Sequence, residues 1–131
     1  MSTYLLDSHV WLWASNSPSR LSPLAQELIN DSRTSLQLSL ASIWEIGIKV
    51  STGKLIIANE ERVDAYVARI NALMGVTLAP ITTRDVEAVT KLPWLHKDPF
   101  DRMLIAQAIS LNIPIITADP HFQLYDVSVM W

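Results

Sequence analysis

The chain has 131 residues, half of them apolar, so it is long enough to bury the core of one domain without covalent cross-links. It contains no cysteine, which excludes disulfides and metal sites built from thiolates. A net charge of −3 argues against nucleic-acid binding through a basic surface, although divalent metals held by some of the acids would reverse the sign of the local field.

The first elements are expected to be a strand followed by two helices. Residues 4–6 form a short apolar run of the kind found in buried strands, and residues 8–15 are apolar on one side, as in a helix. Ser22 and Pro23 then supply an N-cap and a first helical residue. A second helix is therefore expected to run to about Asn30.

The next segment predicts a strand and a helix. Leu36, Leu38 and Leu40 alternate with polar residues at the two-residue period of a strand. Ser42 is the candidate cap of the following helix, and Gly53 is expected to end it.

A helix, a strand and a short helix are expected after residue 60. One helical face is predicted to carry six apolar residues, followed by Gly75 as a stop: Val63, Tyr66, Val67, Ile70, Leu73 and Met74. Residues 76–81 predict a second central strand. Thr83 is the expected cap of a short helix over residues 84–92.

The last elements are a helix that begins at Asp98 and strands within residues 113–119 and 127–131. Strands that alternate with helices in this way predict an α/β fold, with a central parallel β-sheet flanked by α-helices. We expect a single domain over residues 1–131. The order of the strands cannot be read from the pattern.

Four acids are expected at one edge of this sheet. Asp7 and Asp119 follow strands, whereas Glu45 and Asp101 are expected in the first turns of helices. Open α/β sheets bind ligands at the carboxyl ends of their strands. Any one of these acids, taken alone, would more often be a cap or a partner of a helix dipole. The prediction of a site therefore depends on their shared edge.

Four crowded carboxylates resist ionisation unless a cation neutralises them, and oxygen ligands favour Mg²⁺ or Mn²⁺. The three histidines, His9, His96 and His121, lack the spacing of a zinc motif, so we do not expect a zinc site. Divalent ions held by carboxylates activate water for attack on a phosphodiester. The pattern therefore favours phosphoryl-transfer chemistry.

Four segments resemble the successive signatures of PIN-domain proteins of the VapC toxin type: "YLLDSHVWLW", "SLASIWEIGIKVSTGKL", "HKDPFDRMLIAQA" and "IITADPHF". The resemblance extends over about residues 4–125 and implies a PIN-like fold with Mg²⁺- or Mn²⁺-dependent endoribonuclease activity. It assigns catalysis and metal binding to an acidic quartet: Asp7, Glu45, Asp101 and Asp119. It also implies supporting roles for Ser8, the small hydroxyl after the first acid, and for Thr117, a hydroxyl near the metal.

The same resemblance implies the toxin half of a type II toxin–antitoxin pair. The expected partners are an RNA substrate, a second copy in a homodimer, and a small antitoxin that covers the active-site groove and makes any contact with DNA. Trp11, Trp13 and Trp44 flank the acids and are candidates to line the groove, although core packing is the commoner role of tryptophan. With no apolar run long enough for a bilayer and no signal-like N-terminus, we expect a cytoplasmic protein.

The segment "HKDPFDRMLIAQA" places two aspartates at the start of one helix. Asp98 precedes Pro99, so its carboxylate is expected to cap the helix by accepting the N–H of Phe100 or Asp101. Asp101, at the third helical position, is expected to face the sheet edge and bind metal. Removing the Asp98 cap should cost ~1 kcal/mol.

His96, Lys97 and Arg102 surround this turn and are candidate contacts for a phosphate backbone, with solvated surface charges as an equal alternative. The second class of function is a PIN-fold binding module that acts mainly through a complex with a DNA-binding antitoxin. A phosphatase of the haloacid-dehalogenase type would require D-x-D, and the first strand is followed by one acid only. No G-x-G-x-x-G supports a dinucleotide site.

Overall fold

The computed structural model describes residues 2–131 and contains one parallel sheet of five strands in the order β3-β2-β1-β4-β5. The strands are β1 (Ser2–Leu6), β2 (Thr34–Ser39), β3 (Val76–Ala79), β4 (Ile115–Ile116) and β5 (Val129–Met130). The predicted α/β class and parallel sheet are confirmed. β3 is an edge strand and not the central strand that we predicted, and its exposed Thr77 and Leu78 fit that position.

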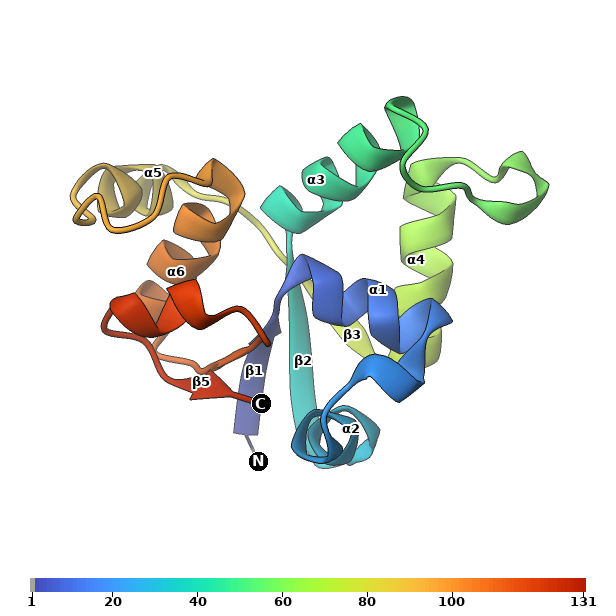
Figure 1. Cartoon of the computed structure of the whole chain (residues 1–131), viewed down its shortest axis with the longest axis horizontal. Helices are drawn as coiled ribbons and strands as arrows, with labels where there is room; N and C mark the ends of the chain where they lie inside the picture. Colours follow the sequence, from blue (N-terminus) through green and yellow to red (C-terminus); the bar gives the residue numbers. More distant parts are fainter. Residues whose placement is uncertain (1) are drawn as a thin grey trace.

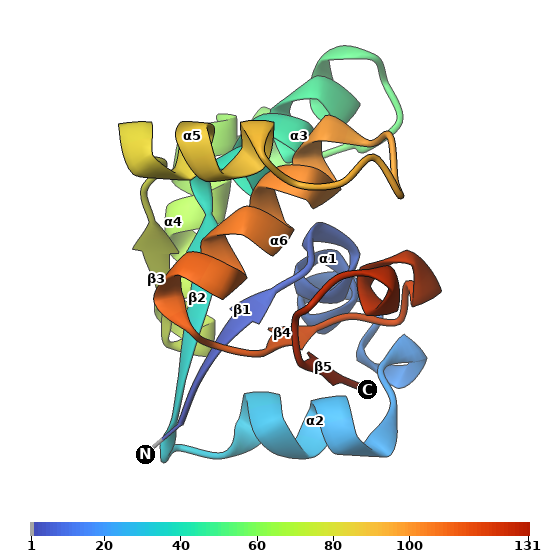
Figure 2. The same ribbon diagram turned by 90° about the vertical axis from the view of Figure 1, so that its left-hand side faces the viewer.

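Helices cover both faces of the sheet. α5 and α6 lie on one side, whereas α1, α3 and α4 lie on the other (Figures 1 and 2). The α-helices are α1 (Ser8–Asn16), α2 (Pro23–Asn30), α3 (Leu40–Ser51), α4 (Val63–Met74), α5 (Thr83–Thr90) and α6 (Pro99–Leu111). Short 3₁₀ helices, absent from the sequence prediction, are η1 (Pro18–Arg20), η2 (Ala58–Glu60) and η3 (Pro120–Leu124).

The two faces of β1 supply two separate cores, because successive strand residues point to opposite sides. Leu6 and the fully buried Trp11 belong to the core beneath α1, α3 and α4. Leu5 packs instead with Leu104 of α6 and Phe122 of η3. β1 is thereby held from both sides, which fixes the position of the residue that follows it.

Local signals placed several helix ends correctly. Ser22 accepts the N–H of Ala25 at the start of α2, and Asp98 caps α6. Gly75 ends α4 with a φ of 69°, a conformation that is accessible to glycine at little cost.

Two predicted caps and one predicted face were wrong. Ser39, not Ser42, caps α3, and Thr82, not Thr83, caps α5. In each case a hydroxyl residue one to three positions earlier makes the capping bond. Leu73 was assigned to the buried face of α4 but is 76% exposed.

The earlier start of α3 changes the position of Glu45. We predicted it in the first turn, but α3 begins at Leu40 and places it in the second turn. β4 is also much shorter than predicted, so Asp119 lies three residues beyond the strand and caps η3. No helix within residues 2–131 combines the length and apolarity that crossing a bilayer would require.

Candidate metal centre

Asp7 lies at the carboxyl end of β1, immediately before α1, and is 4% exposed. Its carboxylate accepts a hydrogen bond of 2.8 Å from the hydroxyl of Thr117. Burial raises the pKa of Asp7 above its ordinary value, and the nearby carboxylate of Glu45 adds to this effect, whereas the Thr117 hydroxyl opposes it. A nearby cation would stabilise the ionised form of this buried carboxyl group.

Thr117 joins two of the predicted quartet residues. Its Oγ1 donates to Oδ2 of Asp7 and accepts the backbone N–H of Asp119 at 3.0 Å. Thr117 is itself buried, just after β4. The hydroxyl therefore fixes the carboxyl end of β1 against the segment that carries Asp119.

The two aspartates at the start of α6 differ in their contacts. Oδ1 of Asp98 accepts the N–H groups of both Phe100 and Asp101, at 2.9 and 3.0 Å, so the predicted cap is present. Oδ2 of Asp101 lies 2.8 Å from Nε2 of His96. Burial raises the pKa of Asp101 to about 6, with a contribution from the charges of Asp98 and Asp7, whereas the His96 contact opposes the rise.

Asp119 is held by its own turn. Its Oδ1 accepts the backbone N–H of His121 at 2.9 Å and lies 2.7 Å from Nδ1 of the same residue. Burial tends to raise the pKa of Asp119, but the two contacts with His121 outweigh it, and the pKa lies below its ordinary value. Asp119 is thus an ionised ligand candidate at neutral pH.

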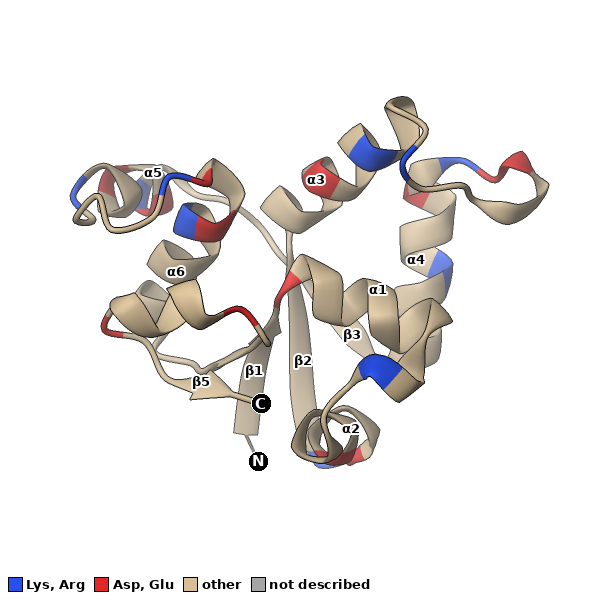
Figure 3. Cartoon of the chain, viewed as in Figure 1, with Lys and Arg blue, Asp and Glu red and all other residues tan. Residues whose placement is uncertain are grey.

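Acidic segments at the end of β1, in α3 and at the start of α6 are visible in Figure 3. Charge interactions connect Asp7 with both Glu45 and Asp101, and the Thr117 hydroxyl connects Asp7 with Asp119. Among the described residues, no hydrogen bond joins Glu45 to the other three acids. We refer to Asp7, Glu45, Asp101 and Asp119 as the carboxylate centre.

The donors of the carboxylate centre fit a hard divalent cation. They are carboxylate oxygens with a hydroxyl nearby, and the pKa is raised both for the buried Asp7 and for the partly buried Asp101. Oxygen donors and uncompensated negative charge suit Mg²⁺ or Mn²⁺. Asp7, Asp101 and Asp119 are the residues best placed to hold such an ion, with Glu45 approaching from α3.

Arg102 does not have the exposed position that we expected. It is 3% exposed, and its guanidinium stacks on the Trp94 ring with its central carbon 3.8 Å from the ring centroid. It donates to four backbone carbonyls and one hydroxyl: the carbonyls of Val89 in α5 and of Leu92, Pro93 and His96 in the loop before α6, and the Tyr125 hydroxyl. With its donors engaged, Arg102 stabilises the loop and is not available to a phosphate.

The other predicted residues around the centre lie in different environments. Lys97 is exposed, as a phosphate contact requires, whereas His96 is half-buried against Asp101. Ser8 is buried and donates to the hydroxyl of Ser42 at 2.9 Å, which joins α1 to α3. Trp11 is fully buried and cannot line a groove, which corrects that expectation.

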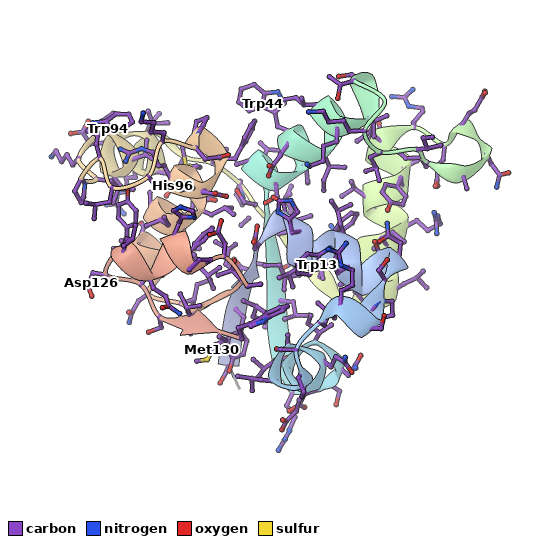
Figure 4. The ribbon with its side chains drawn as sticks, viewed as in Figure 1. Trp13, Trp44, Trp94, His96, Asp126 and Met130 are labelled. Atoms are coloured by element: carbon purple, nitrogen blue, oxygen red, sulfur yellow. The ribbon has the colours of Figure 1, made fainter. Side chains whose placement is uncertain are left out.

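An apolar groove of about 390 Å³ lies between α3, α5 and the start of α6. Trp44 and Trp94 border it and are 67% and 75% exposed, respectively. Figure 4 shows them on two sides of the molecule's upper part, with His96 beside α6. We predicted that Trp44 lines the active-site groove, whereas the apolar groove that it borders is lined by none of the four acids; Trp94 was not predicted.

Sequence reasoning also missed two further contributors. His121 pairs with Asp119 and stacks on His96, with ring centroids 4.5 Å apart and planes inclined by 14°. The Tyr125 hydroxyl accepts the N–H groups of Leu95 and His96 and so shapes the loop that carries His96. Both residues belong to a different segment from the loop that they contact, and no local pattern signals such a pairing.

The model of the PIN domain family matches residues 4–127 of the chain. A comparison with curated protein sequences found no match. The fold is similar to a chain of VapBC2 from Rickettsia felis bound to a DNA fragment from their promoter, with 12% identity, a TM-score of 0.74, and coverage of 98% of this chain and 97% of that chain.

Two further solved structures are similar. For VapBC-1 from nontypeable Haemophilus influenzae the identity is 20%, the TM-score is 0.61, and 98% of this chain and 96% of that chain are covered. For VapBC-5 from Mycobacterium tuberculosis, of the VapBC family of toxin–antitoxin systems, the identity is 18%, the TM-score is 0.61, and 99% and 97% are covered. At these identities the likeness concerns the fold.

Proposed function

The chain belongs to the PIN domain family, and we propose that it is a divalent-metal-dependent endoribonuclease and the toxin of a type II toxin–antitoxin pair. The observation that carries the proposal is the closeness of two carboxyl groups with raised pKa values at the end of β1: Asp7 is buried, Asp101 is partly buried, and the charge of Asp7 adds to the rise in the pKa of Asp101. The similarity to chains of VapBC toxin–antitoxin structures supports the biological role.

Asp7, Glu45, Asp101 and Asp119 would hold Mg²⁺ or Mn²⁺. Such an ion, when bound, supplies a water of lowered pKa for attack on a phosphodiester and offsets the charge of the leaving oxygen. The protein supplies the geometry. Thr117 orients Asp7 and the backbone of Asp119, since its hydroxyl contacts both.

Asp98 and Ser8 have supporting roles in this proposal. The Asp98 cap fixes the first turn of α6, from which Asp101 projects. The hydroxyl of Ser8 is bonded to Ser42 and so holds the start of α1 against α3, the helix that carries Glu45. Both interactions keep acids on different elements at constant separation, as a metal site requires.

We propose three partners: an RNA substrate, a second copy of the chain and an antitoxin. Lys97 is an exposed cation beside the start of α6 and is the remaining basic candidate for contact with an RNA phosphate. We assign the apolar groove between α3, α5 and α6 to a second copy of the chain in a homodimer, since its exposed tryptophans are typical of interface cores. We further propose that the protein is cytoplasmic and that an antitoxin inhibits it and makes the contact with DNA.

Cleavage of RNA by the purified protein tests the proposal. The protein, free of antitoxin, is incubated with total tRNA and rRNA in Mg²⁺ or Mn²⁺, beside Asp7→Asn and the matched exposed control Asp126→Asn. We expect discrete fragments from the wild type and the control, and none from Asp7→Asn or in EDTA. Equal cleavage by Asp7→Asn would reject the carboxylate centre.

The second candidate is a PIN-fold binding module that acts through its antitoxin complex. It is favoured by the Rickettsia felis structure, in which the complex is bound to promoter DNA. The same assay separates the two. If the folded wild-type protein binds metal but cleaves neither RNA class, the binding role is preferred.

A further inference from the structure

His96, His121 and Asp119 each offer one ligand atom, and these three atoms lie within 4.8 Å of one another. His96 comes from the loop before α6, Asp119 follows β4, and His121 lies in η3. The fold thus assembles nitrogen donors beside the carboxylate centre that are separated in the sequence. The proposed nuclease chemistry uses the Asp119 carboxylate but neither imidazole.

Each imidazole is already oriented by a carboxylate. Nε2 of His96 contacts Oδ2 of Asp101 at 2.8 Å, and Nδ1 of His121 contacts Oδ1 of Asp119 at 2.7 Å. A neutral imidazole that donates from one nitrogen carries its lone pair on the other. The available ligand atom of His96 is therefore Nδ1, in the carboxylate–histidine arrangement that is common around bound metals. His121 already places Nδ1 beside the Asp119 carboxylate, so an ion shared by these two groups would take the place of the proton between them.

We propose that His96, His121 and Asp119 form a binding site for a divalent transition metal of the Zn²⁺, Co²⁺ and Ni²⁺ class. Two imidazoles and one carboxylate match the preference of these ions, whereas Mg²⁺ prefers oxygen ligands throughout. The site shares Asp119 with the carboxylate centre, so the inference rests on the proposed function only through that residue.

Metal binding at this site requires a defined movement. Ligand atoms of a tetrahedral ion lie about 3.4 Å apart, whereas the three atoms here are separated by up to 4.8 Å, so the most distant would have to approach by up to about 1.4 Å. The imidazole rings are stacked, with planes inclined by 14°, whereas an ion binds in the plane of a ring. The His121 side chain is 54% exposed and the His96 side chain 16%, so we expect the adjustment to fall mainly on His121.

Cobalt provides a spectroscopic probe that does not depend on RNA cleavage. The metal-free full-length protein is titrated with Co²⁺ in excess Mg²⁺, and the visible absorption of the bound ion is recorded. We expect a band in the wild type, and an affinity more than about tenfold lower in His121→Asn and in His96→Gln. His9→Gln is the matched control, since His9 is the one remaining histidine. It should bind Co²⁺ as the wild type does.

Two further results distinguish this inference from the proposed nuclease. Asp7→Asn, which should abolish cleavage, should keep the Co²⁺ band because Asp7 lies outside the proposed ligand set. Absence of a band in the wild type, or equal Co²⁺ affinity in the His121→Asn, His96→Gln and His9→Gln proteins, would overturn the inference. His121→Asn alters an exposed side chain, so its thermal unfolding should match that of the wild type and confirm that the protein is folded.

Discussion

Replacing Asp101 with asparagine should stabilise the metal-free protein while removing a metal ligand. The pKa of Asp101 rises from 3.8 to about 6 on folding, mainly because the carboxyl group is buried. Between pH 3.8 and about pH 6 the Asp101 carboxyl group keeps its proton in the native state but has released it in the unfolded state, so stability falls as the pH rises. Above about pH 6 the loss is complete.

The magnitude follows from the difference in pKa. A difference of about two units corresponds to about 3 kcal/mol. Since the Asp101 side chain remains 16% exposed, we expect Asp101→Asn to raise the free energy of unfolding by about 2 to 3 kcal/mol at pH 7.5. For a chain of 131 residues this is a rise of roughly 8 to 12 °C in Tm.

Thermal unfolding in EDTA at pH 7.5 and near pH 4 measures this effect. The gain in stability of Asp101→Asn over the wild type should be full at pH 7.5 and nearly absent near pH 4. Near pH 4 the Asp101 carboxyl group of the wild type is protonated for much of the time in both the native and the unfolded state. The exposed Asp126→Asn serves as the control for a change of charge alone. A variant no more stable than the wild type at pH 7.5 would refute the reasoning, and Mg²⁺ should stabilise the wild type but not Asp101→Asn.

Substitutions at three further positions test the surrounding structure. Asp98→Ala should lower the free energy of unfolding by about 1 kcal/mol, whereas Asp98→Asn, which keeps the accepting Oδ1, should leave it nearly unchanged in urea titrations. A stable but inactive Asp98→Ala protein would reverse the roles of the two aspartates. Arg102→Lys should cost about 3 kcal/mol in the same titration, because several partly buried carbonyls lose their donor. A loss below about 1 kcal/mol would show that Arg102 does not stabilise the loop before α6. Thr117→Val should weaken Mn²⁺ binding by about 10- to 100-fold in calorimetry, and unchanged affinity would show that the hydroxyl does not orient Asp7.

The parts of the fold that depend on local chemistry were predictable from the sequence. The Ser22 and Asp98 caps arise from side chains that reach N–H groups two or three residues ahead. The same reasoning misplaced the caps of α3 and α5, since Ser39 and Thr82 offered equivalent hydroxyls slightly earlier in the chain. Local signals identify a helix more reliably than its first residue.

Features that depend on the order of strands were not predictable in this way. β3 was expected at the centre of the sheet and lies at its edge, because crossover connections and not residue periodicity decide which strands become neighbours. The burial of Arg102 likewise depends on carbonyls at the end of α5 and in the loop that follows it, as many as thirteen residues earlier in the chain. The sequence around a charged residue in a helix does not indicate that carbonyls from a distant segment will surround its side chain.

In the candidate site, too, some features were predictable from the sequence and others depend on tertiary structure. The acids at strand ends were found because parallel strands bring their carboxyl ends to one edge, and the structure links Asp7 to Asp119 through Thr117. The His96–His121 stack was missed because a search for zinc motifs considers histidines a few residues apart in one element. In this chain the pair is brought together by tertiary structure.

The chemistry of the RNA ends tests the central claim most directly. If the carboxylate centre directs a metal-activated water onto the phosphodiester, mass spectrometry of the fragments should show linear monophosphate ends, and a 2′-deoxy substitution at the cleaved position should leave cleavage intact. Fragments ending in 2′,3′-cyclic phosphate, or loss of cleavage on 2′-deoxy substitution, would show attack by the RNA's own hydroxyl and would contradict the account.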